Sequence, residues 1–170
     1  MKLLVFSDSH GWLENARNVL RRIGGRMDMV CHLGDYDSDA EELQKEFPTL
    51  PFHVVQGNND FYTTAPQKKM VRAGGKAILL THGHKQRVHW NPDSIAYWAE
   101  EQGADVVLFG HTHVPFWDGR GRVALFNPGS ISMPRDGRPP TFGILTIEDG
   151  RMEGAVMEVC DAETFRRRER

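Results

Sequence analysis

Apolar residues occur along the chain in short runs that end abruptly in polar loops. Four such runs are Leu3–Phe6, Met27–Leu33, Phe52–Gln56 and Asp105–Phe109. Runs of this length, bounded by turn residues, are typical of strands buried on both faces. Between the first two, apolar residues recur at helical spacing, at Leu13, Ala16, Leu20 and Ile23. Strand and helix therefore alternate, which predicts a sheet with parallel strands and crossover helices.

Helix boundaries can also be read from local signals. Gly24 and Gly25 are expected to end the first helix. Ser38, with Glu41 three residues later, forms a capping-box pattern and predicts a second helix over residues 39–47. Asn91-Pro92 offers an N-cap and a first-turn proline for a third helix over about residues 92–102.

The second half of the chain reads mostly as β-structure. Gly74-Gly75 joins two predicted strands as a hairpin, and later turns are expected at Asp118-Gly119 and Asp149-Gly150. No internal repeat or linker interrupts the pattern. We therefore expect an α/β fold in which residues 1–170 form a single domain.

Composition and charge narrow the class of protein. The chain has 170 residues, of which 39% are hydrophobic and 26% are charged, as in ordinary globular domains. A formal net charge of −2 makes long nucleic acid a disfavoured partner. No apolar stretch reaches a membrane-spanning length, and the opening MKLLVF is too short for a signal peptide. Cys31 and Cys160 match no CxxC spacing and are expected to be reduced thiols. We expect a cytoplasmic protein without membrane contact.

Candidate chemistry appears where the apolar runs end. The residues that follow these runs are Asp8, His10, Asp35, Asn58, Asp60, His82, His84, His111 and His113. Each alone has an ordinary explanation as a cap, a turn residue or a buried histidine. These explanations do not account for the presence of such a residue after every apolar run. In open α/β sheets ligands bind beyond the carboxyl ends of the strands, so this placement indicates a shared binding site. His111 and His113 would share one face if the chain stayed extended beyond Gly110.

The donor types narrow the metal. Carboxylate, imidazole and amide oxygen without thiolate suit manganese, iron, zinc or nickel, and they do not fit a cysteine-rich structural zinc site. Even seven ligands out of these nine residues are too many for one ion that keeps an open position. They suit two ions that share a carboxylate, roughly 3.5 to 4 Å apart, as in sites that clamp a phosphoryl group.

The ordered series Asp8-Ser-His10, Gly34-Asp35, Gly57-Asn58, His82-Gly83 and Gly110-His111-Thr-His113 resembles the calcineurin-like metallophosphoesterase superfamily. The short length and the stretch NPGSISMPR over residues 127–135 are similar to its small prokaryotic phosphodiesterase branch. The resemblance implies a two-sheet β-sandwich flanked by helices, with four αββα layers. It also implies two divalent ions, with Mn²⁺ preferred and Ni²⁺, Fe²⁺, Zn²⁺ or Mg²⁺ as alternatives, and a homodimer or homotetramer.

The resemblance assigns a role to each ligand. It implies that the first ion is held by Asp8, His10 and His113, that the second is held by Asn58, His82 and His111, and that Asp35 bridges the two.

Two positions depart from the common family pattern. Many members carry a histidine, thought to protonate the leaving group, where this chain has Asn59 followed by Asp60. An amide cannot deliver a proton, so His84 becomes the candidate proton donor. Asp35, Asn59 and Asp60 are also expected at the catalytic site, where Asp60 can act by orienting the loop. The GDYDSD segment also lacks an arginine found in protein phosphatases, which argues against a phosphoprotein substrate. Arg135 is a candidate for binding the substrate phosphate.

The expected function is hydrolysis of a small phosphodiester by a hydroxide held between the two metals. Two alternatives stay open: a non-catalytic protein-interaction module on the same fold, and a phosphomonoesterase or nucleotide pyrophosphatase. Several aromatic or imidazole side chains near these loops either stack on a substrate base or complete a core or subunit contact. They are Trp12, Phe61, Tyr62, His89 and Trp90.

Overall fold

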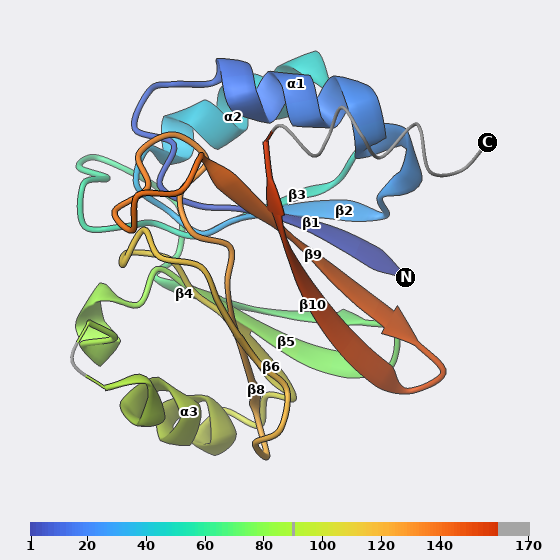
Figure 1. Ribbon diagram of the computed structural model, residues 1–170, viewed down its shortest axis with the longest axis vertical. Coiled ribbons are helices and arrows are strands. Elements are labelled where there is room, and N and C mark those ends of the chain that lie inside the picture. The colour runs from blue at the N-terminus through green and yellow to red at the C-terminus, as the bar shows by residue number, and fades with distance from the viewer. Residues whose placement is uncertain (90, 160–170) are drawn as a thin grey trace.

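The computed structural model describes residues 1–89 and 91–159, so Trp90, Cys160 and the remaining C-terminal residues lie outside the described part. Two five-stranded sheets face each other, with helices on their outer sides (Figure 1). The first sheet has the order β10-β9-β1-β2-β3 and consists of β1 (Lys2–Phe6), β2 (Met29–His32), β3 (Phe52–Val54), β9 (Thr141–Glu148) and β10 (Arg151–Glu158). The second has the order β4-β5-β6-β8-β7 and consists of β4 (Lys68–Ala73), β5 (Lys76–Thr81), β6 (Val106–Leu108), β7 (Phe116–Asp118) and β8 (Ala124–Asn127).

The helices form the outer layers. Helices α1 (Glu14–Ile23) and α2 (Asp37–Glu46) cover the first sheet, and α3 (Pro92–Glu101) covers the second (Figure 1). Strands β1, β2 and β3 are parallel, as are β5, β6 and β8. The four-layer αββα fold and the parallel strands predicted from the sequence are confirmed.

Strand alternation explains why the apolar runs are continuous. Leu3 and Val5 of β1 point between the two sheets and pack in one core with Ile78 and Leu80 of β5. Leu4 and Phe6, the alternate residues of β1, pack instead against α1. Both faces of the strand are buried, so an apolar side chain is needed at every position. Burying one apolar side chain of this size, rather than leaving it exposed, stabilises the fold by roughly 1.5–3 kcal/mol.

Cys31 lies in the core between the sheets and is fully buried. Burial raises the pKa of its thiol to about 12, with a smaller opposing effect from Lys69. The thiol therefore stays protonated and unreactive at neutral pH. Cys160, the other cysteine expected to be a reduced thiol, lies outside the described residues.

Several local predictions are confirmed. The strands β4 and β5 form an antiparallel hairpin across Gly74-Gly75, and β9 and β10 form another across Asp149-Gly150. Asn91 caps α3, because its side chain accepts a hydrogen bond from the backbone N–H of Asp93. Of the helices in residues 1–89 and 91–159, none has both the length and the hydropathy needed to span a bilayer.

The predicted end of the first helix is confirmed but with an unusual cap geometry, and the predicted start of the second helix is wrong. Helix α1 ends at Ile23, but Gly24 keeps a right-handed conformation with φ −53° and leads into the short 3₁₀-helix η1 (Gly24–Arg26). The capping box at Ser38 does not form, since α2 already begins at Asp37. Tyr36 occupies the N-cap position and contributes no side-chain cap. The carboxylate of Asp60, from the loop after β3, accepts the N–H groups of Tyr36 and Asp37 instead.

Candidate metal centre

The loops that follow β1, β2, β3, β5 and β6 meet at one edge of the sandwich (Figure 1). They carry all seven candidate ligands, and five of these have a left-handed backbone: Asp8, His10, Asp35, His111 and His113, with φ between 48° and 69°. Residues other than glycine adopt this backbone conformation at a cost of order 1–3 kcal/mol each. Such strain persists only where the surroundings enforce it, and it is typical of functional loops.

The prediction that His111 and His113 share a strand face is wrong. Strand β6 ends at Leu108, and both histidines have positive φ angles, 69° and 59°. The chain turns rather than continuing extended, so the two rings diverge. His113 reaches His10, with 5.1 Å between ring centroids, and His111 reaches His82 at the same separation.

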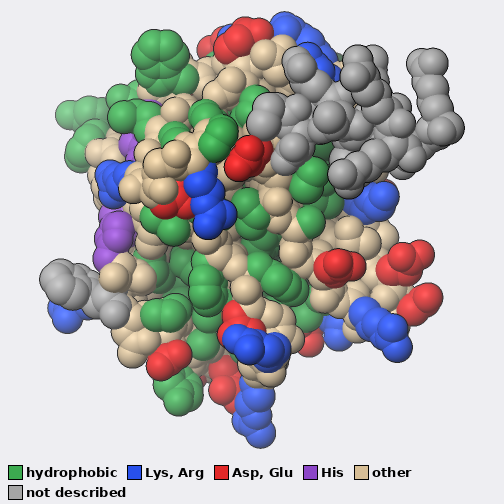
Figure 2. Space-filling view, in the orientation of Figure 1, with side chains coloured by type: hydrophobic (Ala, Val, Ile, Leu, Met, Phe, Trp, Pro, Cys, Tyr) green, Lys and Arg blue, Asp and Glu red, His purple; other side chains and the backbone are tan. Residues whose placement is uncertain are grey.

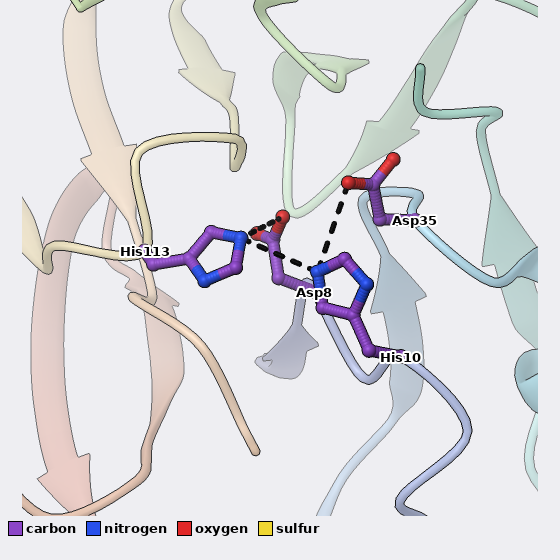
Figure 3. Close-up of side chains that lie close together, drawn as sticks. All are labelled: Asp8, His10, Asp35 and His113. Carbon is purple, nitrogen blue, oxygen red and sulfur yellow. Dashed lines mark hydrogen bonds and ion pairs between the residues drawn. The ribbon is translucent and has the colours of Figure 1, made fainter. Parts of the chain in front are cut away.

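A first group of donors comes from β1, β2 and β6 loops (Figure 3). One ligand atom from each of four residues lies within 4.8 Å of all the others; they are Asp8, His10, Asp35 and His113. His113 Nε2 lies 3.1 Å from Asp8 Oδ1 and 3.3 Å from His10 Nε2. His10 Nε2 lies 3.8 Å from Asp35 Oδ2. Polar atoms this close, aimed at a common point, are suited to binding a cation.

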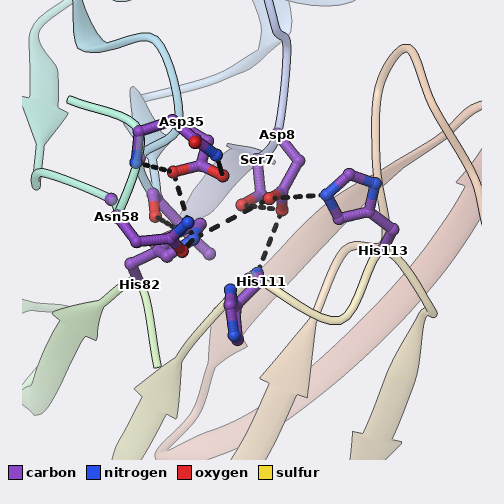
Figure 4. A network of polar contacts seen from close by, with 12 residues as sticks. Ser7, Asp8, Asp35, Asn58, His82, His111 and His113 are labelled. Carbon is purple, nitrogen blue, oxygen red and sulfur yellow. Dashed lines mark hydrogen bonds and ion pairs between the residues drawn. The ribbon is translucent and has the colours of Figure 1, made fainter. Parts of the chain in front are cut away.

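A second group lies on the other side of Asp35 (Figure 4). His82 Nε2 lies 3.3 Å from Asp35 Oδ1 and 3.1 Å from the Asn58 side-chain oxygen. Asp35 therefore directs one carboxylate oxygen toward His10 and the other toward His82. The ring of His111 completes this group beside His82. The structure thus brings all seven predicted ligands into one centre, in two groups that meet at Asp35.

Backbone carbonyls fix two of the imidazole rings. His82 Nδ1 lies 2.7 Å from the carbonyl oxygen of Leu33, and His113 Nδ1 lies 2.6 Å from that of Met133. A carbonyl can only accept, so each Nδ1 must carry the hydrogen. In the neutral ring this leaves the lone pair on Nε2, the atom that points into the centre. Metal-ligating histidines are commonly oriented in this way.

The carboxylates of the centre stay ionised. Burial acts to raise the pKa of Asp8, but the close approach of His113, whose Nε2 is 3.1 Å from Oδ1, and the charges on His82 and His113 outweigh it, so the pKa is lowered. Burial likewise opposes ionisation of Asp35, while His82 and the two hydrogen bonds from Asn59 lower its pKa further. Both residues are nearly inaccessible to solvent. Two buried negative charges are thus held ready for cations.

The imidazoles respond in opposite directions. For His82 and His113 burial favours the neutral ring, but the carboxylates of Asp35 and Asp8 raise the net pKa of both. In the metal-free protein these rings act as the counter-charges of the acids. Burial, followed by the charge on His82, instead lowers the pKa of His111 to about 4. His111 is therefore neutral and able to donate its lone pair at neutral pH.

The side chain of Asp8 shows how well this centre suits a divalent cation. Its Oδ2 accepts hydrogen bonds from the Ser7 hydroxyl and the His111 backbone N–H. Its Oδ1 is buried and accepts no well-oriented hydrogen bond, although the ring of His113 is close. When the His113 ring is neutral and its hydrogen is on Nδ1, this buried oxygen has no donor, which is costly unless a cation satisfies it. Together with a donor set of oxygen and nitrogen, this atom indicates a metal site.

Two glycines allow the loops to approach so closely. A Cβ atom at Gly57 would overlap the carboxylate and backbone nitrogen of Asp35, and one at Gly110 would overlap the hydroxyl of Ser7. Any side chain at either position would push a ligand loop away. The glycines of the Gly57-Asn58 and Gly110-His111 motifs are therefore required by sterics.

Asn59 and Asp60 support the centre in different ways. The Asn59 backbone N–H and side-chain nitrogen donate to the two oxygens of Asp35, at 2.9 and 2.6 Å. Asp60 faces the backbone and accepts four N–H groups, those of Asp35, Tyr36, Asp37 and Gly57. Asn59 thus orients the shared carboxylate, while Asp60 fixes the loop that carries it. A direct catalytic role for either residue stays a prediction.

His84 and Arg135 lie at the margin of the centre. The His84 ring is 5.5 Å from that of His82 and 6.1 Å from that of His111, and its Nδ1 is buried without a hydrogen bond. Burial, then the charge on His82, lowers the pKa of His84. Arg135 is exposed, and its charge acts on His113. Their roles as proton donor and phosphate ligand stay predictions.

Sequence reasoning missed the supporting role of the segment 127–135. The hydroxyls of Ser130 and Ser132 donate to the backbone carbonyl of Asp8, at 2.8 and 2.9 Å. The side chain of Asn127 donates to the Gly110 carbonyl at 2.9 Å. The two serine contacts join residues more than a hundred positions apart in the chain. Such long-range contacts cannot be predicted from a local sequence pattern. One sequence signal could have indicated this role. Ser130 and Ser132 follow the end of an apolar strand, as the metal-ligand candidates do.

Comparisons with known proteins agree with this geometry. The sequence profile of the calcineurin-like phosphoesterase superfamily domain matches residues 1–150. The probable metallophosphoesterase YsnB of Bacillus subtilis (strain 168) is 37% identical over 150 residues, which cover 88% of this chain and 86% of YsnB. The phosphodiesterase YfcE of Escherichia coli (strain K12) is 29% identical over 73% of this chain and 58% of its own length.

A solved structure shares the whole architecture. The crystal structure of a conserved uncharacterized protein, a predicted phosphoesterase from Streptococcus pneumoniae TIGR4, superposes with a TM-score of 0.79 at 33% identity, and covers 94% of this chain and 90% of its own. The fold and the converging ligands define a metal-binding phosphoester hydrolase. The chain belongs to the calcineurin-like phosphoesterase superfamily.

Proposed function

We propose that this protein hydrolyses small phosphodiesters with two divalent cations, of which Mn²⁺ is the preferred species. The observation that carries the proposal is the placement of Asp35, whose Oδ2 faces His10 and whose Oδ1 faces His82. A carboxylate shared between two donor groups is the arrangement expected of a two-metal site. The likeness to the phosphodiesterase YfcE supports a diester as the substrate.

The side chains divide the work by charge. Two divalent cations would neutralise charge on the phosphoryl oxygens and lower the pKa of a bound water. Asp8 and Asp35 would supply the negative charge that retains them, and His82 and His113, whose rings are held through Nδ1, would offer Nε2 as a ligand. Asn59 holds both oxygens of Asp35, which keeps the shared carboxylate from rotating. Arg135, beside His113, would contact a non-bridging phosphate oxygen.

Protonation of the leaving group is the weak point of this site. Asn59 carries no proton to give, and the lowered pKa of His84 leaves its ring neutral at pH 7. Diesters whose leaving group is already stable as an anion should therefore react far faster than alkyl diesters. A rate independent of the leaving-group pKa would contradict this part of the proposal.

The test compares bis-p-nitrophenyl phosphate with p-nitrophenyl phosphate, with added Mn²⁺ and with an Asp35→Ala control. We expect the diester to be hydrolysed faster than the monoester and the variant to be inactive. Faster monoester hydrolysis would favour a phosphomonoesterase. No diester turnover above the variant with any divalent metal would leave a protein-interaction module as the better interpretation.

A further inference from the structure

Three large aromatic side chains near the metal centre are exposed to solvent. The exposed fractions are 71% for Trp12, 75% for Phe61 and 108% for Tyr62. They therefore do not complete a core, so stacking on a substrate base and a subunit contact remain of the expectations drawn from the sequence. In Figure 2 hydrophobic side chains protrude from the edge of the molecule where Figure 1 shows the loop after β3. Of the three, Phe61 and Tyr62 are neighbours along the chain and line one cavity, and exposed apolar groups that adjoin in this way indicate a binding surface.

Phe61 and Tyr62 line a cavity of about 470 Å³ together with Tyr36 and Asn59. This volume lies within the range of roughly 300–1,000 Å³ found for small-molecule sites. Two lining residues connect the cavity to the metal centre. Asn59 donates to both oxygens of Asp35, and the Tyr36 ring packs edge-on against His10 with 5.5 Å between centroids. A group bound in the cavity would thus lie next to the reacting phosphate.

The backbone of the two tyrosines is strained. Tyr36 has φ 77° and Tyr62 has φ 65°, a conformation that bulky residues rarely adopt. Tyr62 makes no core contact that would compensate, because its side chain is fully exposed. Asparagine or glycine would fit the Tyr62 backbone with less strain. The Tyr62 ring thus occupies a strained position without contributing to the core, and it is free to contact a ligand.

The charge of the cavity limits what it can hold. Three acidic residues line it: Asp37, Glu41 and Asp60. Asp60 is satisfied by backbone N–H groups and Asp37 accepts the hydroxyl of Thr63, whereas Glu41 is exposed. A second phosphate would be repelled here. A flat, uncharged ring with N–H groups would stack on the aromatics and donate to Glu41.

We propose that this cavity binds the nucleobase of a nucleoside phosphodiester, so that the substrate class is a nucleotide ester rather than an alkyl or sugar diester. The inference rests on the phosphodiesterase function proposed above. A second copy of the chain would be a poorer occupant. A two-fold interface built on this patch would bury Glu41 of both copies, and the lining of the cavity offers no cationic side chain to pair with it.

The experiment keeps the leaving group constant and varies the other ester group. Thymidine 5′-(p-nitrophenyl phosphate) carries a base, and methyl p-nitrophenyl phosphate does not. We expect kcat/KM of the full-length protein to be about tenfold higher for the thymidine ester, the size of one base stacked on an aromatic ring. The advantage should appear mainly in KM, because stacking binds substrate and transition state alike.

The matched variants remove aromatic rings inside and outside the cavity. Phe61→Ala combined with Tyr62→Asn deletes the two rings, and asparagine tolerates the positive φ at position 62. Tyr97→Ala on α3 is the control, since Tyr97 is 69% exposed and lines no part of this cavity. The double variant should lose the preference for the thymidine ester and keep its rate on the methyl ester. The control should keep both.

Three outcomes would overturn the proposal: equal kcat/KM for the two esters, a preference that survives the double variant, or an equal loss on both esters. A double variant that lowers the oligomeric state, measured by light scattering, would assign the rings to a subunit contact instead. Equilibrium dialysis of thymidine 5′-phosphate against the full-length protein and the double variant separates this proposal from the general one. If neither ester is hydrolysed but the nucleotide binds only when the rings are present, catalysis is refuted and the base site stands.

Discussion

The two sheets contribute different chemistry to the same centre. The loops after β1, β2 and β3 bring the oxygen donors Asp8, Asp35 and Asn58, with one imidazole, His10. The loops after β5 and β6 bring only imidazoles, those of His82, His111 and His113. The first sheet thus supplies the negative charge that attracts a cation, and the second supplies imidazole donors, two of which are held in direction by backbone carbonyls. This division predicts that changes on the two sides have unequal effects.

The largest effect is expected on the carboxylate side. Asp8→Asn removes one of the two buried charges but keeps the shape of the side chain. Because a dication is held chiefly by negative charge, we expect metal content to fall to near zero and kcat/KM to fall on the order of 10³-fold. Metal per chain can be measured by inductively coupled plasma mass spectrometry beside the rate with bis-p-nitrophenyl phosphate. A variant that retains its metal and rate would remove the basis for the comparison.

A smaller effect is expected on the imidazole side. His82→Ala removes a neutral ligand, while Asp8 and Asp35 remain to attract the cations. We expect about a 10²-fold loss of activity, with part of the metal retained and part of the activity restored by excess Mn²⁺. His53→Ala is a matched control, since His53 lies on β3 in the same sheet sandwich but outside the centre. A loss as large as that of Asp8→Asn would show that the two sides do not divide the work by charge.

The two sides also differ in their dependence on pH. Their carboxylates raise the folded-state pKa of His82 and His113 above the usual value near 6.5. The resulting stabilisation of the metal-free protein is complete below pH 6.5 and is lost as pH rises through the raised pKa values. Bound cations need no protonated imidazole. The increase in Tm on adding Mn²⁺ should therefore be larger at pH 8.5 than at pH 6, by several degrees.

Thermal unfolding with Mn²⁺ or with EDTA at these two pH values measures that difference. The lowered pKa values of Asp8 and Asp35 do not contribute, since both groups are ionised throughout this range in the folded and unfolded states. An increase in Tm that is constant or smaller at pH 8.5 would contradict the assignment of these rings as counter-charges.

Asp60 tests the support of the carboxylate side. Asp60→Asn turns an acceptor of four N–H groups into a side chain that presents its own N–H hydrogens to some of them. We expect a loss of about 2 kcal/mol in the free energy of unfolding and a Tm lower by roughly 4–8 °C. Asp28→Asn, at an exposed loop contact with Lys2, is a control that should change Tm by much less. An unchanged Tm would mean that water replaces the cap.

The smallest effect is expected at Arg135. Its side chain is exposed, so its attraction to a substrate phosphate is screened by solvent. Arg135→Ala should raise KM about threefold and leave kcat nearly unchanged, and the increase should shrink as salt is added. Steady-state kinetics at two ionic strengths would show this. A fall in kcat instead would place Arg135 among the groups that act only in the transition state.

The parts of the fold that the sequence predicts best are those determined by the spacing of apolar residues along strands and helices. Leu3–Phe6 alternates between two cores, so its run of apolar residues announces a strand without any tertiary information. The candidate ligands can be predicted in a related way. A buried apolar run stops only where the chain leaves the core, so the polar residues that follow it lie at the end of a strand. Resemblance to a known family then supplies the grouping of those ligands.

The parts that sequence does not predict depend on contacts across the chain. Asp60 caps a helix that begins more than twenty residues before it, which local capping rules cannot detect. The turn at His111 and His113 is imposed by neighbouring loops, among them Asn127 on the Gly110 carbonyl. Alternation alone therefore placed the two rings on one face, whereas packing sent them to different groups.

The left-handed backbone at His10, Asp35, His111 and His113 has a consequence for engineering. Glycine would relax the chain at each of these positions, so a screen for heat resistance alone would enrich such replacements. It would do so while dismantling the centre. Directed evolution toward a hardier form of this protein should therefore select for turnover at every round and leave these four positions unchanged.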